Sequence, residues 1–301
     1  MRLGANAASV CSFHDGRDCS VESHAVAIVP NRHEMMCRFM SMTDGVDGLA
    51  SAHDSMCLSV VVPAFEEVAR LGRTLDAIRH FLDGCGFESE VLVVVDGGHD
   101  GTLDLARGMA RDWPALVVLH HEPNRGKGYA VRRGMLAARG RYRLFSDADL
   151  STPIEDVERL IAAIDEGADV AIGSRALPDS DVRVRQAWWR QLMGRIFNRV
   201  VRRVAVPGIG DTQCGFKCFR GETATRVFGR QRIYGFSFDV ELLWIARKLD
   251  CRVVEVPVTW VNDPFSLVDP VRDSLRMLAD VARLRVDDWR GRYPVGDDEA
   301  R

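Results

Sequence analysis

Two carboxylates one residue apart, Asp147 and Asp149, stand at the end of the apolar run Tyr142–Phe145. Open α/β sheets bind ligands at the carboxyl ends of their strands, so a buried strand here would carry both side chains to such an edge. Hard oxygen ligands suit Mg²⁺ or Mn²⁺ that carries a diphosphate. The pattern itself is common, and a second Asp-x-Asp at residues 179–181 lies beside a proline with no predicted strand before it. The surrounding segments must therefore decide whether the first copy is a metal site.

The first predicted strand, Leu58–Val62, ends in a turn that would expose backbone groups to a ligand. Pro63 and Ala64 form this turn, and Glu67 follows at the predicted start of a helix. A carboxylate at a helix N-terminus interacts favourably with the helix dipole. Glu67 is thus either a ligand-binding residue or simply a good residue for a first helical turn.

Glycines follow the next two predicted strands. Asp96 precedes Gly97-Gly98, and glycines allow positive φ and a close approach of the backbone to a ligand. At the sheet edge, the Asp96 carboxylate could accept a hydrogen bond from a base N–H or a ribose hydroxyl. Further on, Gly126-Lys127 stands at a predicted helix start, where phosphate oxygens bind readily. The segment is not a Walker A loop, because both the earlier glycine and the following Ser or Thr are missing.

An α/β scaffold would bring these segments to one edge. From Leu58 onward, short β-rich runs alternate with amphipathic stretches. This alternation predicts a Rossmann-like, mostly parallel sheet flanked by helices in a single globular domain. The predicted strands are Leu58–Val62, Glu90–Val95, Leu116–His120, Tyr142–Phe145, Asp169–Ile172 and Val253–Val258. The predicted helices are Glu67–Asp83, Thr102–Arg111, Gly126–Arg139, Arg183–Val204, Phe238–Leu249 and Pro270–Val286.

The composition excludes several classes of protein. With 301 residues, 47% of them apolar, the chain can bury a substantial core. Its formal charge of −3 argues against a general nucleic-acid binder. The eight cysteines are scattered without the paired spacing of a zinc site, so we expect reduced thiols and a cytosolic compartment. The apolar runs fall short of the ~18 residues of a membrane-spanning helix.

Taken in order, four segments resemble glycosyltransferase family 2 with the GT-A fold. They read Pro-Ala-Phe-x-Glu at 63–67, Asp-Gly-x-x-Asp-Gly-Thr at 96–102, Asn-x-Gly-Lys-Gly-x-Ala-Val-Arg-x-Gly-Met at 124–135, and Asp-Ala-Asp-Leu-Ser-Thr-Pro at 147–153. Three later segments resemble its dolichyl-phosphate (polyprenyl-phosphate) β-glucosyltransferase branch. These are Gly-Ser-Arg at 173–175, Asp-Thr-Gln-Cys-Gly-Phe-Lys at 211–217, and Phe-Asp-Val-Glu-Leu-Leu at 238–243. The resemblance covers about residues 57 to 286.

On its donor side, the resemblance implies an inverting transferase that takes a hexose from a nucleotide sugar, with UDP-glucose the expected donor. A departing nucleoside diphosphate gains negative charge, which Mg²⁺ or Mn²⁺ held by Asp149, with Asp147 and Ser151, would stabilise. The implied nucleotide-sugar-binding residues are Pro63, Ala64, Glu67, Asp96, Lys127 and Asp147.

On its acceptor side, the resemblance implies a polyprenyl or dolichyl phosphate. This acceptor is already an anion at neutral pH, so it needs neighbouring cations more than a strong general base. Arg175 and Lys217 are the expected cations, with Gln213 as a neutral donor; for both cations the alternative is a surface salt bridge. Asp211 and Asp239 are expected to orient these cations or the sugar hydroxyls, and these five residues with Asp149 form the predicted catalytic set.

Three positions depart from the family pattern. The family usually has two consecutive Asp in the second loop, whereas here Val95 precedes Asp96, which affects base recognition. Glu66 stands where the family usually has Asn, and Leu267 replaces a lysine near the presumed acceptor.

The expected domain boundaries follow from these patterns. Residues 1–56 show little periodicity and are expected to be disordered, or a mis-annotated N-terminal extension, because several internal Met residues could be the true start. Residues 57–290 form the expected GT-A domain, with a nucleotide-sugar half at 57–172 and an acceptor half at 173–290. Residues 291–301 are expected to be a polar tail.

The stretch Arg183–Arg203 contains seven Arg and no acid, interleaved with Trp and aliphatic residues at helical spacing. Such a helix suits an anionic membrane surface, so we expect a peripheral enzyme on the inner, cytoplasmic face of a membrane. Alternatively, its apolar face packs on the sheet. The segment Ser274–Arg292, with five Arg, is a second and weaker candidate. Nucleic acid is not expected as a partner, because the basic stretch is isolated in a slightly acidic chain.

Other functions remain open at this point. Within the same enzyme class, the alternative is a polyprenyl-phosphate mannosyltransferase that uses GDP-mannose. A non-catalytic nucleotide-binding or scaffold relative would account for the altered second loop. A sugar nucleotidyltransferase would also use a metal-binding Asp on an α/β sheet, but the segment at 211–217 gives no reason to expect that reaction.

Overall fold

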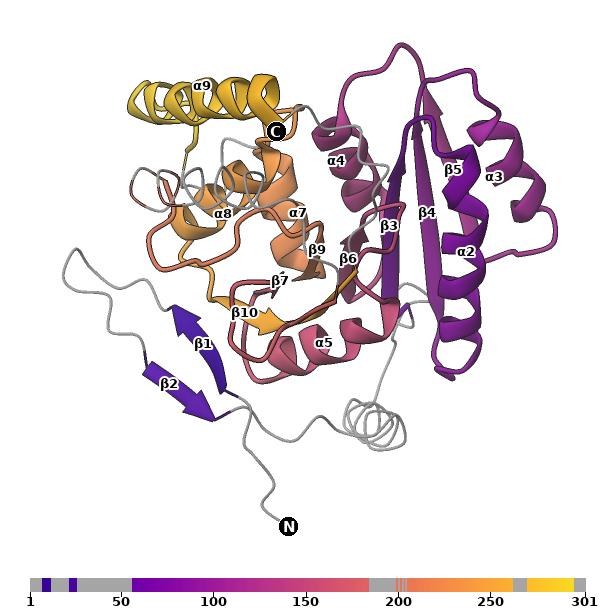
Figure 1. Cartoon of the computed structure of the whole chain (residues 1–301), viewed down its shortest axis with the longest axis horizontal. Helices are drawn as coiled ribbons and strands as arrows, with labels where there is room; N and C mark the ends of the chain where they lie inside the picture. The colour runs from indigo at the N-terminus through magenta and orange to yellow at the C-terminus, as the bar shows by residue number, and fades with distance from the viewer. Residues whose placement is uncertain are drawn as a thin grey trace, which may run out of the picture.

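The computed structural model describes residues 7–11, 22–25, 56–183, 199, 201, 203, 205–261 and 270–294. In these residues a sheet of nine strands lies between two layers of helices (Figure 1). The strand order is β2-β1-β10-β7-β9-β6-β3-β4-β5. The strands are β1 (Ala7–Cys11), β2 (Glu22–Ala25), β3 (Leu58–Ala64), β4 (Ser89–Asp96), β5 (Leu116–His121), β6 (Tyr142–Ser146), β7 (Val170–Ser174), β9 (Phe216–Arg220) and β10 (Val253–Pro257). A separate small sheet pairs β8 (Asp181–Val182) with β11 (Thr259–Trp260).

One half of the sheet is parallel, as predicted. β3 pairs in parallel with β4 and with β6, and β4 pairs in parallel with β5. Every residue of β3 is buried, because helices cover both faces, and such strands read as near-continuous apolar runs. The register places Ala64 beside Val95. The carboxyl ends of β3 and β4 therefore meet at one edge of the sheet.

The antiparallel strand β9 lies between β6 and β7 and was not predicted. Lys217, near its centre, is paired in register with Phe145 on one side and Ile172 on the other. The helix that follows, α7 (Gly221–Gly229), was not predicted either. A mixed sheet flanked by helices in one domain nevertheless confirms the predicted fold class.

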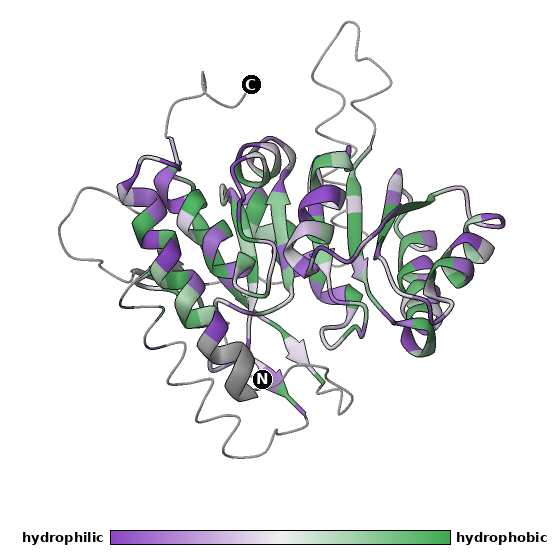
Figure 2. Ribbon diagram, turned by 90° about the horizontal axis from the view of Figure 1, so that it is seen from above, coloured by the Kyte–Doolittle hydropathy of each residue, from purple (hydrophilic) through white to green (hydrophobic). Residues whose placement is uncertain are grey.

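The helices form two layers because alternate residues of each strand point to opposite faces. On one face, Val60 packs in a cluster with Leu71 and Ile78; on the other, Val61 packs in a cluster with Met135. Figure 2 shows the green, hydrophobic strands enclosed by helices whose purple sides face outward. The helices of the first face are α2 (Val68–Asp83), α3 (Thr102–Ala110), η1 (Ile154–Asp156) and α5 (Val157–Asp165). Those of the second face are α4 (Lys127–Ala137), α7, α8 (Phe238–Lys248) and α9 (Pro270–Trp289).

The structure reaches only part of the flanking segments. Within residues 1–56, β1 pairs antiparallel with β10 and with β2; most of that segment lies outside the described residues, and the expectation for it stays a prediction. Most of the basic stretch 183–203 also lies outside them. Tyr293, in the expected polar tail, is buried and donates a hydrogen bond of 2.6 Å to Glu241. Among the described helices, none is both long enough and apolar enough to cross a lipid bilayer.

Candidate active site

A pocket of about 410 Å³ opens at the carboxyl ends of β3, β4 and β6. It gathers all six residues predicted to bind the nucleotide sugar, together with Asp149. The lining residues are Pro63, Ala64, Phe65, Glu67, Arg70, Asp96, Asn124, Gly126, Lys127, Ala130, Asp147, Ala148, Asp149, Gly235 and Phe236. Ser151, predicted as a third metal ligand, is not among them. The shared edge of the sheet thus brings together loops that are far apart in the sequence.

The two carboxylates after β6 are held in different ways. Asp147 Oδ1 lies 2.6 Å from the ammonium nitrogen of Lys127. The backbone N–H of Asp147 donates to the carbonyl oxygen of Gly215 at 3.1 Å, and a Cβ built on Gly215 would lie only 2.2 Å from Asp147 Oδ2. Asp149 Oδ1 accepts a hydrogen bond from the backbone N–H of Ser151 at 2.9 Å. The first carboxylate is therefore packed against Gly215, far along the chain, whereas the second is hydrogen-bonded within its own turn.

This donor set suits a divalent ion that is shared with a ligand. Among the described residues, no group of three or more His, Cys, Asp or Glu side chains is placed to hold a metal. Asp147 and Asp149 both line the pocket, and Mg²⁺ is commonly bound by one or two carboxylates together with substrate phosphates and waters. Ser151 contributes its backbone N–H to Asp149. The residues fit a two-carboxylate site completed by a diphosphate better than an all-protein site.

Lys127 begins α4 and, with Arg70, is one of two cationic side chains among the described residues that line the pocket. Burial alone would lower the pKa of Lys127, but the carboxylates of Asp147 and then Asp239 raise it, so the side chain stays charged. The preceding Gly126 has a φ of 100°, and a Cβ there would lie 2.5 Å from the carbonyl oxygen of Tyr234. The segment at 233–236 therefore packs directly on the start of α4. In this way Gly235 and Phe236, which sequence reasoning missed, come to line the pocket.

Asp96 organises the loop that leads to Lys127. Its two carboxylate oxygens accept hydrogen bonds from the backbone N–H groups of Arg125 (2.7 Å) and Gly126 (2.8 Å). His121 Nε2 lies 2.7 Å from Asp96 Oδ1. Burial lowers the pKa of His121, and it outweighs the opposite effect of Asp96. Asp96 thus has a visible structural role, while its predicted contact with the base or ribose stays a prediction.

A second ion pair lines the pocket near the end of β3. Arg70 Nε lies 2.7 Å from Glu67 Oε2, and a second guanidinium nitrogen donates to Glu67 Oε1 at 2.9 Å. Burial raises the pKa of Glu67, although Arg70 opposes this. Sequence reasoning named Glu67 but not Arg70. The i, i+3 spacing of the two residues, at the N-cap and in the first turn of α2, was the available signal.

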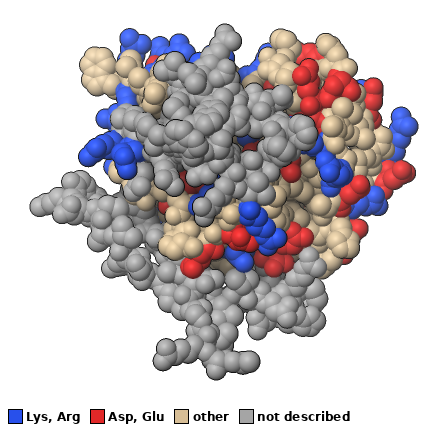
Figure 3. Space-filling model, viewed as in Figure 1, with Lys and Arg blue, Asp and Glu red and all other residues tan. Residues whose placement is uncertain are grey.

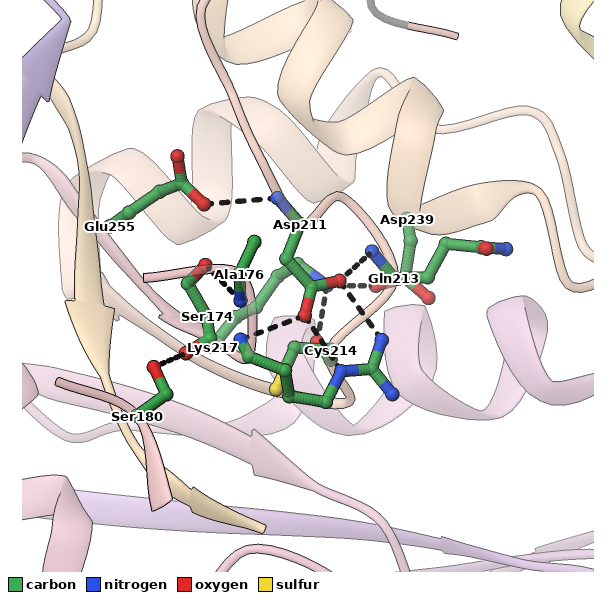
Figure 4. A network of polar contacts seen from close by, with 10 residues as sticks. Ser174, Ala176, Ser180, Asp211, Gln213, Cys214, Lys217, Asp239 and Glu255 are labelled. Atoms are coloured by element: carbon green, nitrogen blue, oxygen red, sulfur yellow. Dashed lines mark hydrogen bonds and ion pairs between the residues drawn. The ribbon is translucent and has the colours of Figure 1, made fainter. Parts of the chain in front are cut away.

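The half of the domain that is expected to bind the acceptor holds a second group of charges, centred on Asp211. The Arg175 guanidinium donates to both Asp211 oxygens at 2.7 and 2.9 Å. Glu255 accepts from the backbone N–H groups of Gly210 and Asp211, and the backbone N–H of Gln213 donates to Asp211 at 3.2 Å. Figure 4 shows Glu255 and Gln213 reaching Asp211 from opposite sides. Burial would raise the pKa of Asp211, but Arg175 outweighs it and lowers the pKa to about 2.

Lys217 is fully buried and satisfied within the protein. Its ammonium donates to Asp239 and, at 2.5 Å, to the carbonyl oxygen of Cys214, and it lies 5.3 Å from the centre of the Phe145 ring. Burial raises the pKa of Asp239, against the effect of Lys217. The Arg175 side chain, by contrast, is 31% exposed. Direct contact of either cation with an acceptor phosphate stays a prediction.

Comparison with known protein families identifies the family to which this chain belongs. The family model described as "Glycosyl transferase family 2" matches residues 59–224. This chain belongs to glycosyltransferase family 2.

Several family 2 relatives share one description, dolichyl-phosphate beta-glucosyltransferase. The protein from Dictyostelium discoideum is 38% identical over 244 residues, which cover 77% of this chain and 75% of the relative. The protein from Drosophila melanogaster is 39% identical and covers 80% of this chain and 77% of its own. The human protein is 33% identical and covers 85% of this chain and 84% of its own. The chain is therefore similar to these proteins over most of their length.

Solved structures support the GT-A fold of the family. A mannosyl-3-phosphoglycerate synthase from Rubrobacter xylanophilus matches with a TM-score of 0.57 at 18% identity, over 78% of this chain and 75% of that chain. A glucosyl-3-phosphoglycerate synthase from Mycobacterium tuberculosis, solved with Mn²⁺, UDP and glucosyl-3-phosphoglycerate, matches with a TM-score of 0.53 at 19% identity. That match covers 80% of this chain and 81% of that one.

Two departures from the family 2 pattern acquire a structural meaning. Val95, where the family usually has an Asp, is only 1% exposed and belongs to the apolar core, so the sheet edge is left to Asp96. Glu66, where the family usually has Asn, has a φ of 54°. Asn is among the residues that tolerate this left-handed conformation best, and most other residues are strained in it.

Proposed function

We propose that this chain transfers glucose from UDP-glucose to a dolichyl or related polyprenyl phosphate, with inversion at the anomeric carbon. The observation that carries the proposal is the single pocket that gathers six predicted donor-side residues and Asp149. The family 2 relatives described as dolichyl-phosphate beta-glucosyltransferases, at 33 to 39% identity, support the choice of sugar and acceptor.

In the proposed donor complex, Asp147 and Asp149 hold Mg²⁺ or Mn²⁺ together with the diphosphate. When bound, such an ion supplies positive charge against the negative charge that builds on the departing nucleoside diphosphate. Lys127 has two tasks. It neutralises Asp147 in the absence of donor, through the 2.6 Å contact, and it can turn toward phosphate oxygens at the start of α4 when donor binds. Asp96 keeps the backbone of that loop in place.

On the acceptor side, we propose that Arg175 offsets the repulsion between the acceptor phosphate and the donor diphosphate. Asp211 fixes its guanidinium through a bidentate contact, and such pairing restricts the direction in which the remaining N–H groups point. Lys217 contributes from within the wall of the site, by holding Asp239 and the carbonyl of Cys214. The acceptor is a lipid, and we place the reaction at the cytoplasmic face of a membrane.

Nucleotide selectivity tests the donor half of the proposal. With Mn²⁺ present, UDP is expected to raise the melting temperature of the full chain and GDP is not, because a ligand that binds only the native state stabilises it. Stabilisation by GDP alone would favour a GDP-mannose-dependent enzyme.

The transfer reaction tests the proposed sugar, the proposed acceptor and the catalytic activity itself. The chain is incubated with a mixture of sugar nucleotides and a polyprenyl phosphate, and the lipid product is identified by mass spectrometry. A hexosyl phosphopolyprenol that depends on UDP-glucose supports the proposal. Product at background level, equal for the wild type and for Asp149→Ala, would instead identify a non-catalytic relative.

A further inference from the structure

One side of α9 carries apolar and basic side chains that are exposed. Along the helix, Met277, Val281 and Leu284 are buried against the protein. At 3.6 residues per turn, the opposite side of the helix carries Ala279, Ala282, Arg283, Val286, Trp289 and Arg290, which we call the outer face of α9. Trp289 is 86% exposed and Val286 is 45% exposed. An exposed indole on this scale contributes nothing to the core.

The acidic and basic side chains of α9 lie on different sides of the helix. The described acids all have partners at the border with the protein: Asp280 accepts from Ser237, Asp287 pairs with Arg292, and Asp288 pairs with Lys248. On one flank of the apolar strip stand Arg283 and Arg290. On its other flank Arg285 stacks on the ring of Trp244 at 4.8 Å. The outward side of the helix is therefore apolar at its centre and positive at its edges.

The inner side of α9 packs next to the active site. Gln213 donates to the sulfur of Met277 at 3.1 Å, and Ser237 donates to Asp280 at 2.9 Å. Ser237 directly follows Gly235 and Phe236, which line the pocket. Figure 1 places α9 along the top of the molecule, and Figure 3 shows basic side chains along the same upper left edge. A surface that binds α9 from outside is therefore one helix away from the segments that line the pocket.

We propose that the outer face of α9 docks the enzyme on an anionic phospholipid surface. A helix with an apolar strip rimmed by Arg lies in the plane of a bilayer interface, and Trp prefers the level of the headgroups. Basic side chains beside it are attracted to anionic lipids. Charge complementarity favours a lipid surface over a second copy of the chain, because a dimer formed through two outer faces would place the Arg side chains of one copy near those of the other. Docking would deliver the pocket to an acceptor whose phosphate sits at the bilayer surface.

Vesicle co-sedimentation of the full chain tests the proposal. The wild type is expected to bind vesicles of phosphatidylcholine mixed with phosphatidylserine, and less so as salt rises. The double variant Arg283→Glu/Arg290→Glu is expected to partition at least about 20-fold more weakly, from about fivefold for each charge. Trp289→Ala is expected to weaken partitioning both into these mixed vesicles and into vesicles of phosphatidylcholine alone, because it removes apolar insertion and not charge.

The matched control is Arg107→Glu/Arg111→Glu, in the last turn and at the C-cap of α3, which makes the same change in net charge at exposed positions away from α9. This control is expected to bind like the wild type. Equal losses in the two double variants would overturn the proposal, because they would reflect net charge alone. Full retention of binding by Arg283→Glu/Arg290→Glu would overturn it as well, and so would a lipid-free dimer that dissociates on Trp289→Ala.

The functional reason for docking rests on the proposed function, in which the acceptor is a lipid. The vesicle assay measures docking alone, because it requires no sugar transfer. A short-chain, water-soluble polyprenyl phosphate separates the two proposals. With that acceptor, the α9 variants are expected to keep wild-type activity and to lose it only with long-chain acceptor embedded in vesicles. Loss of vesicle binding without transfer to any acceptor would leave docking supported and the proposed function overturned.

Discussion

The proposed donor and acceptor halves of the site each contain a Lys–Asp ion pair, but one pair lies at an open pocket and the other is buried. In the proposed donor half, Lys127 and Asp147 meet at the wall of an open pocket, and we expect both to change partner when a ligand binds. In the acceptor half, Lys217 and Asp239 are enclosed and satisfy each other. A Lys–Asp pair is therefore proposed to bind ligand in the first place, whereas it stabilises the fold in the second. The degree of burial, rather than the residue types, determines which of these two roles a pair has.

The two groups are nevertheless one electrostatic unit. Asp239 helps to raise the pKa of Lys127, and Asp147 contributes to the environment of Arg175. If this comparison is correct, changes in the donor half should remove activity from a folded protein. Changes in the acceptor half should first remove stability.

The largest expected effect is in the donor half. Asp149→Ala should lower the rate of transfer from labelled UDP-glucose by about 10³-fold or more, equivalent to about 4 kcal/mol in the barrier, because one of two proposed metal ligands is lost. The melting temperature without ligands should change little. Asp179→Ala, in the exposed second copy of Asp-x-Asp, is the control and should keep full activity.

In the acceptor half, Lys217→Met should lower the free energy of unfolding by about 3 kcal/mol, because it leaves Asp239 buried without its cation. This cost lies at the low end for a buried pair, because Asp239, whose pKa is raised by burial, can protonate. Chemical denaturation measures the loss. Lys217→Met/Asp239→Leu should recover most of the stability without recovering activity, and no recovery would contradict the assignment of the pair to architecture.

The contact between the halves should be sensitive to one methyl group. Gly215→Ala places a Cβ 2.2 Å from Asp147 Oδ2, so the carboxylate must move. We expect transfer to fall about 30-fold, or about 2 kcal/mol. A Cβ at Gly108 of α3 meets nothing within 4 Å. The control Gly108→Ala should keep activity and gain about 0.5–1 kcal/mol in stability.

The Arg175–Asp211 pair predicts a dependence of stability on pH. Because the folded-state pKa of Asp211 is depressed to about 2 from an ordinary value of 3.8, the pair stabilises fully above about pH 4 and loses this contribution as pH falls toward 2. Asp211→Asn should therefore cost about 2 kcal/mol at neutral pH. Denaturation at a series of pH values should show the gap between the wild type and the variant closing between pH 4 and 2. A constant gap would mean that the charge of Asp211 contributes nothing.

The smallest expected effect is a gain. Glu66→Asn should stabilise the protein by up to about 1 kcal/mol, because Asn relieves the strain of the left-handed backbone at φ 54°. The melting temperature without ligands measures this gain. A decrease would show that the Glu66 side chain stabilises the loop more than its backbone strains it.

The pocket was predictable because most of the residues expected to bind the donor lie at or just after the carboxyl end of a strand of the sheet. Pro63, Asp96 and Asp147 each end an apolar run, and parallel strands bring such ends to one edge. The acceptor half was not predictable in the same way. The strand β9 carries Lys217 near its centre, which interrupts its apolar pattern, and the pairing that satisfies this lysine comes from Asp239 on α8.

Tertiary packing accounts for the other residues that were missed. Gly235 and Phe236 reach the pocket only because the preceding segment packs on Gly126 and Gly128. The ion pair of Arg175 and Asp211 joins residues 36 positions apart, a distance at which no periodic pattern signals a contact. Asp211 and Asp239 were both expected to orient the two cations or the sugar hydroxyls, but the sequence does not indicate which carboxylate pairs with which cation.

The position of β9 limits how this enzyme can be re-engineered. The strand hydrogen-bonds to β6 on one side and β7 on the other, and the residue just before it, Gly215, packs on Asp147. A chimaera that took only residues 57–172 from a relative with another donor preference would set a foreign Asp147 against a native Gly215. Recombination should therefore carry residues 211–220 along with the donor half, although they lie some forty positions beyond it in the chain.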